Sequence, residues 1–191
     1  MPAFIAPPPN IPFYLRLGIW LARRVTGKDL LPPRLLAWYP KAAISSGAME
    51  ALVAHGDDGL DARLLKIVRL QVSCTAACPF CIDMNGFDPE HQLTAEEANA
   101  LQAGRDPDTI ATFSLRERLA AQYARGLSLT PPAFSPELIA AVRAHLTERE
   151  LVILATTAAQ VNYRARLLQG LGVPPAGFTD ACAIPPSITP P

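Results

Sequence analysis

The chain has 191 residues, of which 50% are hydrophobic and 18% charged, so it can build a packed core and lacks the composition of a disordered protein. Seventeen basic residues balance seventeen acidic ones without a Lys/Arg stripe, which argues against a nucleic-acid-binding protein. No apolar run approaches the ~18 residues of a membrane span, and Arg16 interrupts the apolar N-terminal stretch, so we expect a cytoplasmic protein without a secretory signal.

Prolines divide the chain into segments. The twenty prolines cluster at residues 2–12, 32–40, 131–136 and 174–191. Pro-rich segments cannot join a packed helix, so the first nine residues and the tail after Phe178 are expected to be extended. We expect three parts: an N-terminal arm with an amphipathic helix (1–31), a helical domain (32–175) and a Pro-rich tail (176–191). Cys182, in the tail, is expected to have no role.

The expected helices begin with an amphipathic one at residues 11–25. A lone helix of this kind gains little stability unless its apolar stripe is buried, so we expect it to pack on a second subunit. The net charge of zero also promotes association. Pro40 opens the next helix. Asp61 caps another, in which Leu64, Leu65, Val68 and Val72 share one face.

Helix starts recur along the rest of the chain. Three capping boxes pair a hydroxyl residue with a glutamate three residues later, at Thr94/Glu97, Ser114/Glu117 and Thr147/Glu150. Ser135 before Pro136 starts a further helix, and the last helix, about 148–169, ends at Gly170 and Gly172. No alternating strand pattern is present, so the predicted fold is all-α with roughly seven to nine helices.

The strongest chemical signal is the segment C-T-A-A-C-P-F-C at residues 74–81, which holds three of the four cysteines. Pro79 is favoured at the first position of a helix, which places Cys78 at the N-cap and Cys81 one turn in. The partial positive charge of a helix N-terminus favours thiolate over thiol. Cys78 and Cys81 are therefore a candidate redox pair, whereas Cys74 is more simply a buried apolar position.

A metal site is the alternative interpretation of the same cysteines. Cys74, Cys78 and Cys81 resemble the iron–sulfur signature of radical S-adenosylmethionine enzymes, but the capped helices that follow do not resemble the strand–helix alternation of those enzymes. A zinc site would need a fourth ligand, and His91 is the nearby imidazole. We therefore expect neither a metal nor another cofactor.

The stretch L-L-K-I-V-R-L-Q-V-S-C-T-A-A-C-P-F-C-I-D-M-N resembles the core of the carboxymuconolactone decarboxylase / alkylhydroperoxidase D-like family, and the resemblance continues over roughly residues 32–175. It implies an orthogonal or antiparallel all-α bundle that assembles into dimers, trimers or hexamers. In the peroxidase members, the residue matching Cys81 attacks a hydroperoxide and the one matching Cys78 resolves it as a disulfide. The partial positive charge at the helix N-terminus instead makes Cys78, at the N-cap, the more acidic thiol. The identity of the nucleophile therefore stays open.

The proton relay of those peroxidases is absent here, because Lys66, Phe80 and Asn85 replace its glutamate and two histidines. A general base typically contributes ~10²–10⁴-fold, so its loss predicts slow turnover unless another group substitutes. The Lys66 ammonium is a candidate that would lower the thiol pKa by charge. Asp83 is expected to be an ordinary polar helix position, and Asn85 either orients substrate or ends a helix with Gly86.

The histidines are weaker candidates. His91 is an outside candidate for a base, whereas His55 and His145 are expected to be ordinary surface residues. The leading hypothesis is a thiol-dependent, peroxidase-like oxidoreductase that cycles Cys78 and Cys81 against a peroxide and is restored by an unknown thiol reductant. The alternatives are a non-catalytic helical oligomer, a carboxymuconolactone decarboxylase-like enzyme and, last, an iron–sulfur protein.

Overall fold

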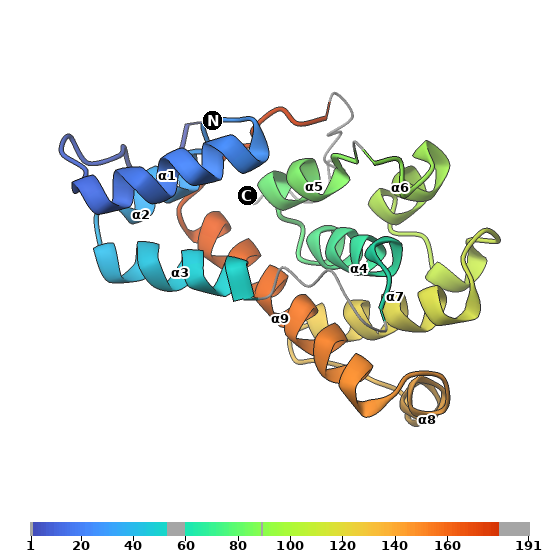
Figure 1. Ribbon diagram of the computed structural model, residues 1–191. Helices are drawn as coiled ribbons and strands as arrows, with labels where there is room; N and C mark the ends of the chain where they lie inside the picture. Colours follow the sequence, from blue (N-terminus) through green and yellow to red (C-terminus); the bar gives the residue numbers. More distant parts are fainter. Residues whose placement is uncertain (1, 53–59, 89, 180–191) are drawn as a thin grey trace.

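The computed structural model describes residues 2–52, 60–88 and 90–179. Within these ranges the chain is all-helical, which confirms the predicted fold class (Figure 1). The helices are α1 (Phe13–Thr26), α2 (Leu31–Leu36), α3 (Pro40–Leu52), α4 (Ala62–Thr75), α5 (Pro79–Gly86), α6 (Ala95–Gln102), a short 3₁₀ helix (Pro107–Thr109), α7 (Leu115–Ser128), α8 (Pro136–His145) and α9 (Glu148–Gly170).

The predicted helix starts are present. All three capping boxes close in both directions, the side chains of Asp61 and Ser135 accept from the third residue of their helices, and Gly172 adopts a left-handed φ of 64° after α9. Helix α2 is not predicted, because its two prolines make the segment look like a separator. Both lie in the first turn, where a missing N–H costs nothing.

Helix α4 lies at the centre of the fold and packs against α5, α6, α7 and α9 (Figure 1). Its predicted apolar face joins a core with α7, α8 and α9. Ile67 and Leu70, on other sides of the helix, pack with residues of α6 and α7. Because α4 is buried on several sides, it is a rigid support for the turn and the helix that follow it.

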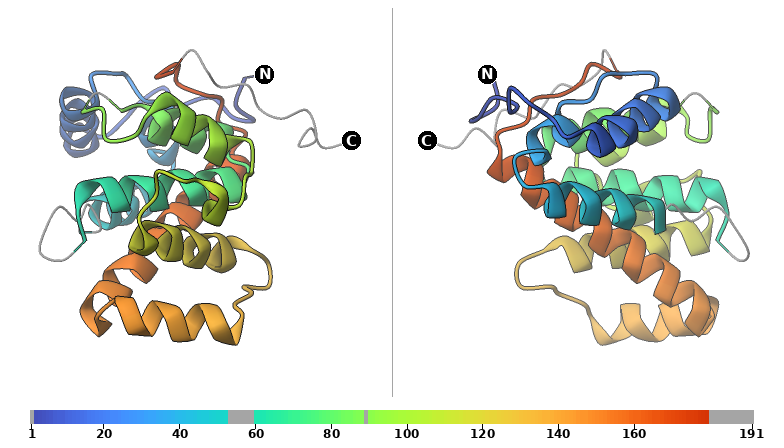
Figure 2. Two further views of the ribbon diagram at one scale, coloured as in Figure 1. Left: turned by 90° about the vertical axis from the view of Figure 1, so that its right-hand side faces the viewer. Right: turned by 60° about the vertical axis from the view of Figure 1, so that its left-hand side comes forward.

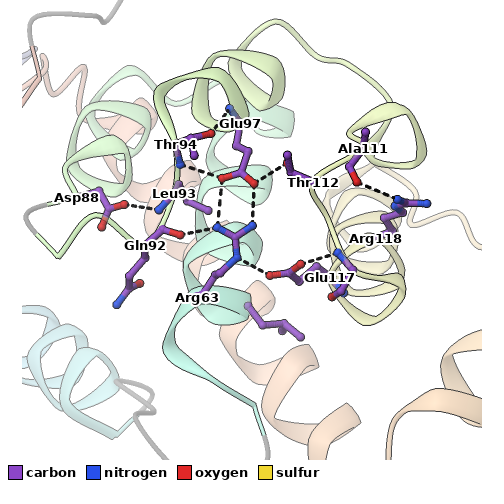
Figure 3. Close-up of polar contacts among 12 residues, drawn as sticks. Arg63, Asp88, Gln92, Leu93, Thr94, Glu97, Ala111, Thr112, Glu117 and Arg118 are labelled. Carbon is purple, nitrogen blue, oxygen red and sulfur yellow. Dashed lines mark hydrogen bonds and ion pairs between the residues drawn. The ribbon is translucent and has the colours of Figure 1, made fainter.

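A buried ion-pair cluster links the starts of α4, α6 and α7 (Figure 3). Arg63 donates to Glu97 at 2.7 and 3.1 Å and to Glu117 at 2.6 Å. Thr112 adds a hydrogen bond to Glu97 at 2.6 Å. Both glutamates also close capping boxes, so one arginine holds two helix starts in place.

Helix α1 is formed as predicted, and it lies at the opposite end of the molecule from α8 (Figure 2). Its apolar side chains point largely to solvent: Phe13, Leu17, Trp20, Leu21 and Val25 are between 55% and 83% exposed. In the described ranges, none of the helices combines the length and apolar character that crossing a bilayer requires.

Candidate thiol site

The turn between α4 and α5 sets the direction in which α5 starts. Ala77 adopts a left-handed φ of 51°, which is uncommon for a residue with a Cβ. Gln169 of α9 holds this turn, because its Nε2 donates to the carbonyls of Ala76 at 2.8 Å and Ala77 at 3.0 Å. A side chain far along the chain therefore fixes the backbone directly before Cys78.

Cys78 is the N-cap of α5, as predicted. Its Sγ accepts a hydrogen bond from the backbone N–H of Cys81 at 3.3 Å, and Pro79 occupies the first helical position. The two side chains thus meet at the positive end of the helix dipole. Both are thiols in this structure, and they are 1% and 0% exposed.

The two thiols have opposite acidities. The hydrogen bond with Cys81 lowers the pKa of Cys78; burial opposes it, and the N–H groups of Cys81 and Phe80 and the charge of Arg164 reinforce it. The pKa of Cys81 is raised, first by its hydrogen bond with Cys78 and then by burial and by the neighbouring charge of Cys78, against the effect of Arg164. The pair therefore ionises first at Cys78, as the helix-cap argument predicts.

Apolar groups enclose the pair. Cys78 and Cys81 belong to one cluster with α2, α9 and the segment after α9, whose buried members include Leu35, Phe80, Ala165, Leu168 and Val173. Ala3 of the N-terminal arm packs against the same cluster. The two sulfur atoms therefore have little contact with solvent in this structure.

Residues 173–179, here called the C-terminal strap, are tied to α5 through Asp83. This carboxylate is fully buried and accepts from the backbone N–H groups of Ala176 and Thr179, both at 2.8 Å, and from the Thr179 hydroxyl at 3.2 Å. The prediction that Asp83 is an ordinary polar helix position is wrong. Burial raises its pKa, but the N–H groups of Thr179, Phe178 and Ala176 outweigh burial and lower the pKa overall.

The strap has a second attachment in Lys28, which follows α1. Its Nζ donates to the carbonyls of Ala176 and Gly177 and lies 4.5 Å from the centre of the Phe178 ring. At the other side, Phe178 contacts the Phe87 ring, with 5.4 Å between the centres. The strap thus lies between α5 and the segment that joins α1 to α2.

Arg164 of α9 is a site residue that sequence patterns do not reveal. Its Nη1 pairs with the Glu50 carboxylate of α3 at 3.2 Å, and its side chain is 12% exposed. Its Nε and Nη2 are buried and have no oxygen or nitrogen acceptor in the described part of the chain, and a hydrogen bond from its side chain acts on Cys81. Its charge lowers the pKa of both Cys78 and Cys81.

The groups at the relay positions are engaged elsewhere. The prediction that Lys66 brings its ammonium toward the thiols is not supported, because its Nζ donates to the Phe87 carbonyl, and the charges acting on Lys66 are those of Asp88, Arg69 and Glu90. Phe80 is buried in the thiol cluster. Asn85 donates to the Ser73 hydroxyl at 2.8 Å, at the end of α5.

Cys74 packs on the cluster of Ile67 and Leu101, whereas Cys78 and Cys81 pack in another cluster. Across the described ranges, no group of three or more His, Cys, Asp and Glu side chains is placed to hold a metal ion.

The two described histidines are exposed, in contrast to the buried thiols. His91 lies between α5 and α6 with a positive φ of 53°, and His145 is the last residue of α8. His55 and Cys182 lie outside the described residues.

Comparisons with known proteins agree on the architecture, although no family model matches the chain. Uncharacterized protein YnjA of Escherichia coli (strain K12) is 27% identical over 181 residues, 95% of this chain and 97% of that protein. The apo structure of the debrominase Bmp8 superposes with a TM-score of 0.73 at 14% identity, over 87% of this chain and 88% of the other.

An alkylhydroperoxidase AhpD core, an uncharacterized peroxidase-related protein from Ralstonia eutropha JMP134, gives a TM-score of 0.73 at 18% identity, over 92% of this chain and 94% of the other. At these identities the likeness is one of fold. The chain has the all-α fold of the alkylhydroperoxidase D core, as its resemblance to that family implies.

Proposed function

We propose that the protein is a thiol-dependent oxidoreductase that cycles Cys78 and Cys81 between dithiol and disulfide, with a peroxide as the oxidant. The observation that carries this proposal is the pairing of the two cysteines at the start of α5, where the Cys78 sulfur accepts from the Cys81 N–H at 3.3 Å. The lowered pKa of Cys78, which results first from its hydrogen bond with Cys81, supplies a nucleophile.

The reaction is a two-electron exchange. A thiolate attacks the peroxide oxygen, the O–O bond breaks, and a sulfenic acid forms as the alcohol or water leaves. The second thiol then attacks the sulfenic sulfur, which forms the disulfide and releases water. An external dithiol returns the two electrons and restores both thiols.

Turnover is expected to be slow, because Lys66, Phe80 and Asn85 stand where a proton relay would act. The neighbour Bmp8 is a debrominase, and one of its structures holds 2,3,4-tribromopyrrole. A halogenated aromatic compound is therefore the second oxidant to test against this pair. A non-catalytic helical oligomer is the alternative that remains if the thiols do not react.

Peroxide should convert the two thiols into one internal disulfide. We expect intact-mass measurement after alkylation to show two fewer reactive thiols per chain, with Cys78 and Cys81 joined in the peptide map. Cys78→Ser and Cys81→Ser should each abolish this bond, because each removes one of its sulfurs. Cys182→Ser is the matched control and should leave the bond intact. Thiols that stay reduced in the folded protein would refute the enzyme and leave the scaffold alternative.

We further propose that the N-terminal part, residues 1–31, packs against a second copy of this chain in a cytoplasmic homo-oligomer. Support comes from the exposed apolar side chains of α1 and from the net charge of zero. Phe13 and Val25 are the most exposed of these side chains, at 83% and 79%.

A further inference from the structure

We propose that Arg164 is the positioning residue of the cysteine pair: its guanidinium balances the negative charge of the ionised pair, and the Glu50 carboxylate competes with the pair for that positive charge. This inference deepens the proposed function and depends on it for its meaning in catalysis. In the absence of the proton relay, the positive charge of Arg164 on α9 would stabilise the thiolate.

The hydrogen bonding of Arg164 divides its guanidinium into two sides. Nη1 is held by both oxygens of Glu50, at 3.3 and 3.2 Å, on the solvent side of α9. Nε and Nη2 are buried without an oxygen or nitrogen acceptor among the described residues, and Cys81 is the side chain whose pKa a hydrogen bond from Arg164 lowers. A thiol sulfur is a weak acceptor, so these buried donors are poorly paired while both cysteines are neutral. An arginine left in this state is suited to an anion that is present during only part of a cycle.

The charges near Arg164 favour such an anion. Arg69 of α4 and Arg164 of α9 repel one another, and Glu50 is the carboxylate that acts on both. Two guanidinium groups and one carboxylate carry one net positive charge. A thiolate at Cys78 or Cys81 would bring this sum to zero, and Arg164 is the member of the group whose charge lowers the pKa of both thiols.

Arg164 supplies charge and not a proton. An arginine stays protonated in proteins, so it cannot accept the proton that leaves the thiol. It can hold the thiolate before attack and, by the same charge, an oxyanion that leaves the peroxide. Its planar fork lets the buried edge face the sulfurs while Nη1 stays with Glu50.

The test is the pH at which the pair ionises, followed by ultraviolet thiolate absorbance of the folded protein, with the Cys78→Ser/Cys81→Ser variant subtracted. Removal of an opposite charge at short range shifts a pKa by ~1–3 units, so Arg164→Gln should move the midpoint up by about one unit or more. Arg164→Lys keeps the charge and should recover part of the shift.

Glu50→Gln separates this role from a structural one. It removes a competing negative charge, so the midpoint should move down, opposite to the effect of Arg164→Gln. If the ion pair only holds α3 against α9, the two substitutions act in the same direction, and that result would overturn the proposal. An unchanged midpoint in Arg164→Gln would overturn it as well.

Arg166→Gln is the matched control, because Arg166 lies on the same helix, is exposed and donates to the Thr130 hydroxyl at 3.4 Å. Its midpoint should equal that of the wild type. The titration uses no peroxide, so it is independent of the proposed function. If Arg164→Gln shifts the midpoint but peroxide leaves the wild-type thiols reduced, the proposed oxidoreductase activity is refuted and the proposed role of Arg164 stands. If peroxide forms the disulfide but Arg164→Gln leaves the midpoint unchanged, the role of Arg164 is refuted and the oxidoreductase proposal stands.

Discussion

Replacing Arg63 by methionine should destabilise the fold by roughly 3–5 kcal/mol, because it leaves two buried carboxylates without their cation. Glu97 and Glu117 have side chains only 3% and 10% exposed, and Arg63 donates to both. Methionine keeps the length of the side chain, so the loss reports on charge and hydrogen bonding. The measurement is the free energy of unfolding in urea at neutral pH.

Arg34→Met is the control for this prediction. Arg34 also forms an ion pair, with Asp29 at 3.2 Å, but both side chains are about half exposed. Exposed pairs contribute about 0–1 kcal/mol, so this variant should unfold close to the wild type. If Arg63→Met and Arg34→Met lower the free energy of unfolding equally, the buried Arg63 cluster stabilises the fold no more than an exposed ion pair does.

The same cluster makes a prediction for acid. The hydrogen bond from Arg63 lowers the pKa of Glu97 to about 2, although burial opposes it. Because the folded pKa lies below the unfolded one of ~4.3, this stabilisation is complete above that value and is lost as the pH falls toward 2. In Arg63→Met the pKa of Glu97 should rise, so stability should fall less steeply between about pH 5 and 3 than in the wild type.

Asp83→Ala should speed alkylation of Cys78 and Cys81 at least tenfold in the folded protein. The carboxylate holds the strap by three hydrogen bonds, and bonds to a charged group contribute about 1.5–3 kcal/mol each. Loss of even one such bond raises the open population about tenfold or more, and buried thiols react in proportion to that population. Peptide mass spectrometry after timed iodoacetamide treatment gives the rates.

Asp88→Ala is the matched control, because Asp88 also accepts from a backbone N–H, that of Leu93 at 2.6 Å, but lies outside the strap contacts. Its thiols should react at the wild-type rate. Acid should also weaken the attachment of the strap. The folded pKa of Asp83 is lowered, so the attachment is complete above its unfolded pKa of ~3.9 and is lost as the pH falls through the folded value. Thiols in Asp83→Ala as slow as in the wild type would show that the strap is not the cover.

Most of the fold follows from local signals in the sequence. Helix starts are set by a side chain and a backbone group three residues apart, so Thr94, Ser114 and Thr147 identify their own helices. The N-cap position of Cys78 follows from Pro79 in the same way. Helix α2 is missed because the proline pair at 32 and 33 is compatible with either a loop or a first helical turn.

The rest of the site depends on contacts between distant parts of the chain, which local patterns do not encode. Arg164 sits on α9 among residues of ordinary helical composition, and only the crossing of α9 with α5 brings its charge to the thiols. Asp83 looks like one polar position in a helix until the strap returns to it. Lys66 is near the pair in sequence, yet its ammonium bonds to the Phe87 carbonyl.

The cluster around the thiols joins residues from distant parts of the chain: Ala3 packs there with Val173 and Ala176, and the N–H of Phe4 donates to the carbonyl of Leu171 at 3.0 Å, directly before the strap. During synthesis, α5 leaves the ribosome long before residues 173–179 do. A nascent chain that has not yet released residues 173–179 therefore lacks Val173 and Ala176 from the cluster around the dithiol, and the pair gains this part of its packing only when the strap docks.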